Sequence, residues 1–252
     1  MPLLLLLACT PNPLGPHLVA DGQYWLFQPP GVPIEGAAVY VHLHPDGDGA
    51  GLADNDTLLD ELTRQGLIAV FPDGGGDPGD DWNVGINKDD IPRDDTVFLA
   101  NVAADLRDRW GAAVLWLGGS SKGGAMSYEM ACLGEPVYDG YVPISGAIEA
   151  PLPHACTAPP APIRHLQGTR DDRWPLHTAD DPDSTHMGIL DSLGELQASD
   201  DTCLEAEPTI EGDCQVWAGC PAEVRLCMYE GGHAMPSNWV ELQVAGMQML
   251  KQ

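Results

Sequence analysis

The chain has 252 residues, of which 44% are hydrophobic, so it is long enough to form one α/β domain with a sizeable buried core. Its 11 Lys and Arg residues against 38 Asp and Glu residues give a net charge of −27, and such a surface repels phosphate backbones, which argues against nucleic-acid binding. No stretch of the sequence approaches the roughly 20 apolar residues that are needed to cross a bilayer. The acidic residues are spread along the chain, which indicates a solvated acidic surface.

The N-terminus has features of an export signal. A short apolar run over residues 3–7 leads into Leu6-Leu7-Ala8-Cys9, which resembles a bacterial lipobox whose cysteine is lipidated after cleavage. We therefore expect a signal-like segment over 1–22, with a proline-containing linker over 10–22 and a possible lipid anchor at Cys9. A disordered or strand-like N-terminus is the alternative. The first interpretation predicts a secreted protein or a periplasmic or outer-surface lipoprotein.

Short apolar runs then alternate with segments of helical spacing. The sequence predicts an edge strand over 23–28 and further strands over 37–43, 67–71, 113–117, 141–144, 163–166, 215–217 and 223–229. It predicts helices over 57–65, 96–110, 122–132, 187–196 and 238–250. This alternation predicts a single α/β domain over 23–252, with a mostly parallel sheet covered on both faces. Ligands of such sheets bind at the carboxyl ends of the strands, where the loops 44–56, 73–90, 118–122 and 167–175 begin.

The loop after the predicted strand 113–117 carries a candidate nucleophile. Ser121 has glycine two residues before it and two residues after it, whereas Ser120 has Lys122 at the second position and does not fit the pattern. A serine on a sharp strand-to-helix turn needs glycine at these positions, because side chains there would collide with the neighbouring strand and helix. Lys122 would be the first residue of the following helix, and its backbone N–H would act as one oxyanion donor. We expect the Lys122 side chain to point to solvent.

A candidate acid and a candidate base follow Ser121 in the chain. Hydrolases whose nucleophilic serine lies on a strand-to-helix turn have these residues in the order Ser, acid, His. Asp171 lies in a loop after the predicted strand 163–166, with Asp172 as its rival. His233 follows two glycines and the last predicted strand. Histidine can accept and return a proton near neutral pH, and the carboxylate would hold its imidazole in the productive tautomer.

With these residues in view, the chain resembles the polyhydroxybutyrate-depolymerase-like esterases, which include feruloyl and acetylxylan esterases of the α/β-hydrolase superfamily. The likeness runs from about residue 37 to the C-terminus. It rests on ordered motifs, namely LHPDG at 43–47, DWN at 81–83, GSSKGG at 119–124, QGTRDD at 167–172 and GGHAMP at 231–236.

The resemblance implies roles for residues around the triad. It places the second oxyanion donor on the backbone N–H of Asp46, although Pro45 stands where the family has glycine. It matches Trp82 to an aromatic side chain near the substrate groove. We also expect His44 and Trp174 to contact the substrate.

Seven cysteines indicate the redox environment. Cys9 stands apart, and the even set that follows is typical of disulfides in an oxidising compartment, whereas a metal site is disfavoured because no CxxC pair is present. Six cysteines allow fifteen connectivities. The family resemblance implies the pairs Cys132–Cys156, Cys203–Cys220 and Cys214–Cys227.

Together these features predict a secreted, monomeric serine ester hydrolase that works through an acyl-enzyme and needs no cofactor or metal. Polyesters, feruloyl esters and acetyl esters are the candidate substrates. A peptidase or amidase of the same fold is one alternative. A non-catalytic acidic protein that binds calcium or a polymer surface is the other.

Overall fold

The computed structural model describes residues 14–77, 79–85, 90–149, 156–180, 185–197 and 201–250. Cys9 and the rest of the lipobox-like segment lie outside these ranges, so the lipid anchor stays a prediction. Within the described ranges, no helix combines the length and apolar character that a membrane span requires.

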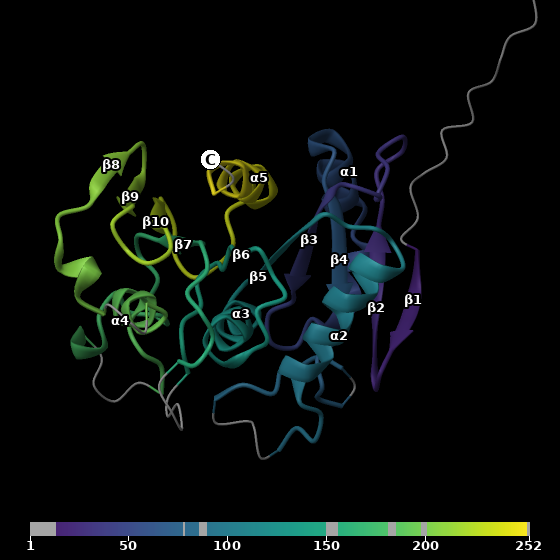
Figure 1. Cartoon of the computed structure of the whole chain (residues 1–252), viewed down its shortest axis with the longest axis horizontal. Helices are drawn as coiled ribbons and strands as arrows, with labels where there is room; N and C mark the ends of the chain where they lie inside the picture. Colours follow the sequence, from purple (N-terminus) through teal and green to yellow (C-terminus); the bar gives the residue numbers. More distant parts are fainter. Residues whose placement is uncertain are drawn as a thin grey trace, which may run out of the picture.

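The strands of the described chain form one sheet in the order β1-β2-β4-β3-β5-β6-β7-β10-β9-β8 (Figure 1). The six central strands from β4 to β10 are parallel, and antiparallel strands extend both edges. The strands are β1 (Leu14–Val19), β2 (Gly22–Phe27), β3 (Ala38–Leu43), β4 (Ile68–Pro72), β5 (Val114–Gly119), β6 (Gly140–Tyr141), β7 (Ile163–Gly168), β8 (Thr209–Glu211), β9 (Cys214–Trp217) and β10 (Val224–Tyr229).

Helices cover both faces of the sheet. Helices α1 and α5 pack on one face, and α2, α3 and α4 lie on the other (Figure 1). The helices are α1 (Asp56–Gln65), α2 (Asp95–Asp108), α3 (Lys122–Leu133), α4 (Ile189–Glu195) and α5 (Trp239–Met249), with short 3-10 helices η1 (Gly49–Asp54), η3 (Thr178–Asp180) and η4 (Asp201–Glu205).

Local signals set the ends of the helices. Helix α1 begins after Asn55, whose side chain accepts the N–H of Leu58, and it ends at Gly66 with a left-handed φ of 63°. Helix α2 begins after Asp94, whose carboxylate accepts two N–H groups of the first turn. These caps satisfy backbone groups that have no partner within the helix.

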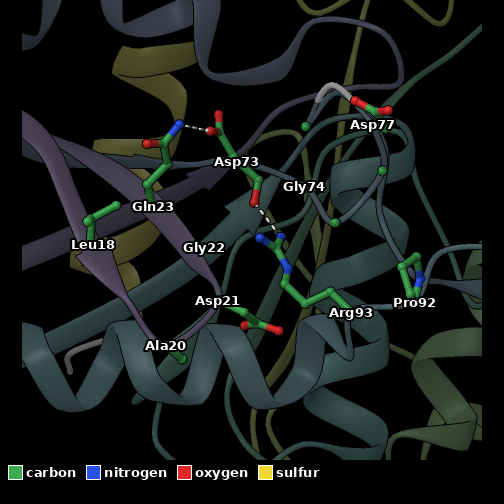
Figure 2. A pocket seen from close by; sticks show the side chains of 13 residues that line it. Leu18, Ala20, Asp21, Gly22, Gln23, Asp73, Gly74, Asp77, Pro92 and Arg93 are labelled. Atoms are coloured by element: carbon green, nitrogen blue, oxygen red, sulfur yellow. Dashed lines mark hydrogen bonds between the residues drawn. The ribbon is translucent and has the colours of Figure 1, made fainter.

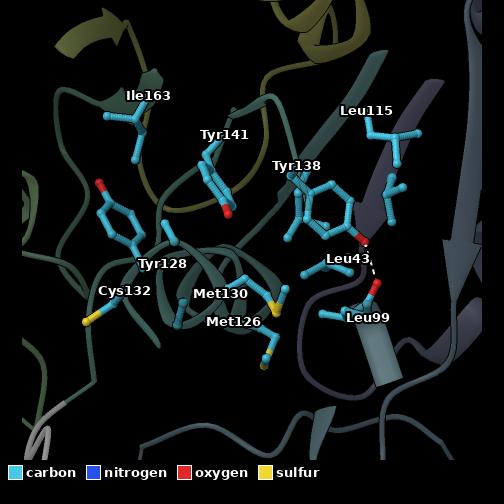
Figure 3. Close-up of a cluster of buried hydrophobic side chains, with 14 of the residues drawn as sticks. Leu43, Leu99, Leu115, Met126, Tyr128, Met130, Cys132, Tyr138, Tyr141 and Ile163 are labelled. Carbon is cyan, nitrogen blue, oxygen red and sulfur yellow. Dashed lines mark hydrogen bonds between the residues drawn. The ribbon is translucent and has the colours of Figure 1, made fainter. Parts of the chain in front are cut away.

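Helix α3 lies in the centre of the larger core. Its residues 123–132 are all buried, so it lacks a polar face (Figure 3). In the same core Tyr138 donates its hydroxyl to the carbonyl of Leu99 at 2.9 Å, which satisfies a buried polar group (Figure 3). The helix that starts at the candidate nucleophile is therefore fixed from every side.

The mostly parallel sheet flanked by helices that the sequence predicts is confirmed, and every helix and strand expected from residue 23 onward is present within a few residues. The predicted linker over 10–22 is wrong in its described part, because residues 14–19 form strand β1 against β2. The prolines suggested a linker, but an edge strand tolerates proline where its N–H needs no partner. Residues 23–28 consequently do not form the edge. The short strand β8 was not expected.

Three disulfides join Cys132 to Cys156, Cys203 to Cys220 and Cys214 to Cys227. These are the pairs that the family resemblance implied. The first ties the end of α3 to the segment before β7, and the last joins the neighbouring strands β9 and β10.

Candidate active site

The candidate nucleophile lies on a strained turn between β5 and α3. The backbone of Ser121 has φ 53° and ψ −119°, a conformation that residues with a side chain rarely adopt. Its N–H donates to the carbonyl of Ile144 at 3.0 Å, and its carbonyl accepts the N–H of Ala125 at 2.9 Å. These bonds hold the strained turn in place.

The two glycines that flank Ser121 are required by close packing. A Cβ on Gly119 would lie 2.4 Å from the carbonyl oxygen of Leu43, and a Cβ on Gly123 would lie 2.3 Å from the same oxygen. Side chains at these two positions would therefore collide with the end of strand β3, as the sequence pattern predicts for both sides of Ser121.

Three side chains from separate loops form a hydrogen-bonded chain. His233 Nε2 lies 3.0 Å from Ser121 Oγ, and His233 Nδ1 lies 3.2 Å and 3.3 Å from the two carboxylate oxygens of Asp171. The loops follow β5, β7 and β10, whose carboxyl ends lie at one edge of the parallel sheet. The structure thus brings His233 into contact with Ser121, which is 112 positions away in the chain, and with Asp171, which is 62 positions away.

The carboxylate of Asp171 is fixed within its own loop. It accepts the backbone N–H groups of Arg173 at 3.0 Å and Trp174 at 3.3 Å, and its side chain is fully buried. Burial alone raises the pKa of Asp171, but hydrogen bonds from His233 and Arg173 outweigh it, and the pKa is lowered. The rival residue, Asp172, is exposed.

The acid loop and the base loop are joined through their backbones. Arg170 N–H donates to the carbonyl of Gly231 at 2.7 Å, and Thr169 N–H donates to the carbonyl of Tyr229 at 2.9 Å. A Cβ on Gly168 would lie 2.3 Å from the carbonyl oxygen of Gly232. The glycine of the QGT triplet therefore permits the close approach that places His233 beside Asp171.

The loop after β3 carries the predicted second oxyanion donor. His44 Nε2 accepts the N–H of Gly74 at 3.1 Å, so its Nδ1 carries the proton and donates to the carbonyl of Pro45 at 2.8 Å. Burial lowers the pKa of His44, in keeping with this neutral form. Gly47 N–H donates to the carbonyl of Asp80 at 2.9 Å. These contacts hold the backbone on both sides of Asp46.

The N–H of Lys122 opens helix α3 and has no acceptor within the helix. Its side chain does not point to solvent as expected. It forms an ion pair with Asp81 at 2.6 Å and is only 12% exposed. The segment 79–85 folds against the start of α3, and this contact between distant residues cannot be read from the local sequence.

An additional acidic residue lies near this ion pair. Glu149 is 6% exposed, and its burial raises its pKa to about 7, an effect that the positive charge of Lys122 opposes and that the charges of Asp81 and Asp46 reinforce. It packs against Gly85, where a Cβ would lie 2.2 Å from its carboxylate. The sequence carries no local signal for this residue, because a single glutamate in a loop is unremarkable.

The residues expected to contact substrate are buried. Trp82, Trp174 and His44 are 0%, 4% and 1% exposed. Trp82 donates its indole N–H to the carbonyl of His44 at 2.9 Å and stacks on the His44 ring, and Trp174 stacks on His186. This burial is at odds with the expected contact with substrate. The indole N–H of Trp82 and both ring nitrogens of His44 have partners inside the protein, so these two side chains support the loops of the site.

A buried ion pair anchors the glycine-rich loop after β4. Asp95 is fully buried and accepts N–H groups from Gly75 at 3.3 Å and Asn83 at 2.7 Å, as well as the Arg93 guanidinium at 2.6 Å. Beside this loop lies a cavity of about 690 Å³, in which Gln23 donates to Asp73 and Arg93 donates to the Asp73 carbonyl (Figure 2). No residue of the Ser121–His233–Asp171 chain lines this cavity.

Comparisons with known proteins agree with this fold. No family model and no curated protein matches the sequence. Among solved structures, the chain is similar to an acetyl xylan esterase from Aspergillus awamori, with 13% identity, a TM-score of 0.58 and coverage of 90% of this chain and 94% of that one. A carboxylesterase from Mesorhizobium loti matches with 17% identity, a TM-score of 0.60 and coverage of 94% and 99%. The Bacillus cereus carboxylesterase matches with 13% identity, a TM-score of 0.58 and coverage of 92% and 95%.

At these identities the likeness establishes the fold. The protein has the α/β-hydrolase fold, in which one mostly parallel sheet is flanked by helices.

Proposed function

We propose that the protein is a serine carboxylic ester hydrolase that works through an acyl-enzyme. The observation that carries this proposal is the hydrogen-bonded chain from Asp171 through His233 to Ser121, which ends on a serine held at a strained strand-to-helix turn. Nucleophile, base and orienting acid stand in the order and geometry that acyl transfer requires.

In the proposed mechanism Ser121 Oγ attacks the ester carbonyl while His233 Nε2 takes its proton. Asp171 holds the proton on Nδ1 and stabilises the imidazolium that forms. The backbone N–H groups of Lys122 and Asp46 stabilise the oxyanion, and the loss of one such donor costs about 10²–10³ in rate. His233 then protonates the leaving alcohol and activates the water that releases the acid.

Charge near the site narrows the substrate class. Asp81, Glu149 and Asp46 lie around the start of α3, and the only charge opposing them among these residues is Lys122, which Asp81 already pairs. We infer a neutral ester, of the polyester, feruloyl or acetyl type, because a polyanionic substrate would be repelled. Similarity in fold to an acetyl xylan esterase is compatible with this range. The disulfides favour secretion, and we expect a monomer.

A p-nitrophenyl ester series from acetate to longer acyl chains tests the proposal. Ser121→Ala removes the nucleophile, so ester turnover should fall to background while the fold is retained. Ser120→Ala is the matched control, because it deletes the same hydroxyl one residue away and should leave turnover close to that of the wild type. The acyl-chain preference would then define the substrate.

Two further readouts separate the alternatives. A fluorophosphonate probe should label the wild type and not the Ser121→Ala variant, since only an activated serine reacts. Faster turnover of a matched anilide than of the ester would instead identify an amidase. A folded, disulfide-bonded wild type that the probe does not label would sink the proposal and leave the non-catalytic alternative.

A further inference from the structure

The hydroxyl of Tyr229 contacts the backbone on both sides of the candidate base. It lies 3.0 Å from the carbonyl oxygen of Gly232 and 3.0 Å from that of Ala234, the two neighbours of His233 in the chain. Gly231 lets the ring come this close, because a Cβ there would lie 2.8 Å from a ring carbon. One hydroxyl proton is thus shared between two acceptors that bracket the imidazole.

A second hydroxyl, that of Ser145, lies beside the hydroxyl of Tyr229. Ser145 Oγ lies 3.3 Å from the Tyr229 hydroxyl, and hydrogen bonding by Ser145 is among the influences that lower the pKa of Asp171, after those of His233 and Arg173. Ser145 is fully buried and has a φ of 45°, although it is not glycine. Such a conformation costs free energy and persists only where its surroundings hold it.

The turn that carries Ser145 also touches the nucleophile. Ser145 N–H donates to the carbonyl of Leu166 at 3.0 Å, which fixes the turn on β7. A Cβ on the next residue, Gly146, would lie 2.3 Å from the carbonyl oxygen of Ser121. The same turn therefore packs against the backbone of Ser121 and carries the hydroxyl that lies beside that of Tyr229.

From these contacts we propose that Tyr229 and Ser145 are positioning residues for the triad, an inference that rests on the proposed function. Tyr229 holds the base loop so that His233 Nε2 faces Ser121. Ser145 supports the Tyr229 hydroxyl from the turn that packs on the backbone of Ser121. Neither residue contacts the reacting atoms. Both act by fixing the imidazole, whose displacement by about 1 Å could cost up to 10²-fold in rate.

Tyr229→Phe removes only the hydroxyl and is the direct test. The turnover number should fall about 10-fold while KM stays within about twofold, because substrate binding does not involve the hydroxyl. Tyr138→Phe is the matched control, since it removes a tyrosine hydroxyl that donates to a carbonyl at 2.9 Å outside the base loop (Figure 3). It should lose stability without a change in the turnover number.

Ser145→Ala gives a readout that a merely structural role would not move. Because the Ser145 hydroxyl contacts that of Tyr229, the losses in turnover number caused by Ser145→Ala and Tyr229→Phe should not add in the double variant, while KM stays within about twofold. Losses that add in the double variant would refute the role of Ser145.

Hydrogen exchange tests whether Tyr229 holds the loop that carries His233, without any assay of activity. The amides over 231–235 should exchange faster in Tyr229→Phe than in the wild type or in Tyr138→Phe. Unchanged exchange, or a turnover number equal to that of Tyr138→Phe, would overturn the role of Tyr229. If the wild type shows no ester turnover, the proposed function fails, and exchange over 231–235 still decides whether Tyr229 holds the loop.

Discussion

At the scale of single residues, the site depends on a serine and two partners whose geometry is set by backbone contacts. The strain at Ser121 is balanced by its bonds to Ile144 and Ala125, and Asp171 is held by two backbone N–H groups in its own loop. In the proposed mechanism, preorganisation of this kind would let the imidazole of His233 act without rearranging its surroundings in the transition state.

The two neighbouring aspartates give a sharp residue-level prediction. Asp171→Asn should lower the turnover number by about 10⁴, because the amide favours the wrong tautomer of His233. Asp172→Asn removes the same charge from an exposed side chain and should remain within about twofold of the wild type. Steady-state kinetics on one p-nitrophenyl ester measures both variants, and a larger loss in Asp172→Asn would reverse the assignment.

At the scale of elements, the turn that carries Ser121 joins β5 to α3 and packs against the end of β3. Glycines at 119 and 123 let the start of α3 approach the carbonyls of Leu43 and His44. The same two carbonyls lead into the loop that carries Asp46. The packing of one helix against one strand therefore sets the position of the nucleophile relative to the proposed oxyanion donor.

Gly123→Ala tests this packing. Its Cβ would lie 2.3 Å from the Leu43 oxygen and 2.5 Å from the His44 oxygen, so α3 and the end of β3 must separate. We expect a loss of about 1–3 kcal/mol in the free energy of unfolding and a lower turnover number. Gly219→Ala, where a Cβ meets nothing within 4 Å, is the control and should change neither quantity. Thermal unfolding and ester turnover report the two effects, and equal behaviour of the two variants would contradict the packing argument.

At the scale of the whole molecule, the net charge of −27 opposes the compact state through self-repulsion. Salt should therefore stabilise the protein. Raising NaCl from about 0.02 M to about 0.5 M shortens the Debye length from roughly 20 Å to a few ångströms, so Tm should rise by several degrees. Glucose at matched osmolality controls for general exclusion of solute. A Tm that is unchanged or lower in NaCl would show that the acidic residues do not repel one another appreciably in the folded state.

The sheet as a whole also shows which strands and helices could be predicted from the sequence. Apolar runs and helical spacing predicted the central strands and helices, because these patterns reflect burial of local segments. They failed at β1, where prolines suggested a linker, and at β8, whose three residues are all exposed. Both strands lie at sheet edges, where neither burial nor hydrophobic alternation marks the sequence.

Within the candidate site, the sequence by itself determined the features that depend on local chemistry. These are a serine between spaced glycines, the chain order of nucleophile, acid and base, and the presence of adjacent aspartates in one loop and of His233 in another, each loop following a strand. Only the tertiary structure decided which groups meet: Asp171 rather than Asp172 at His233, Asp81 at Lys122, and the burial of Trp82. Residues far apart in the chain come into contact only when the sheet is complete, so no local pattern encodes those distances.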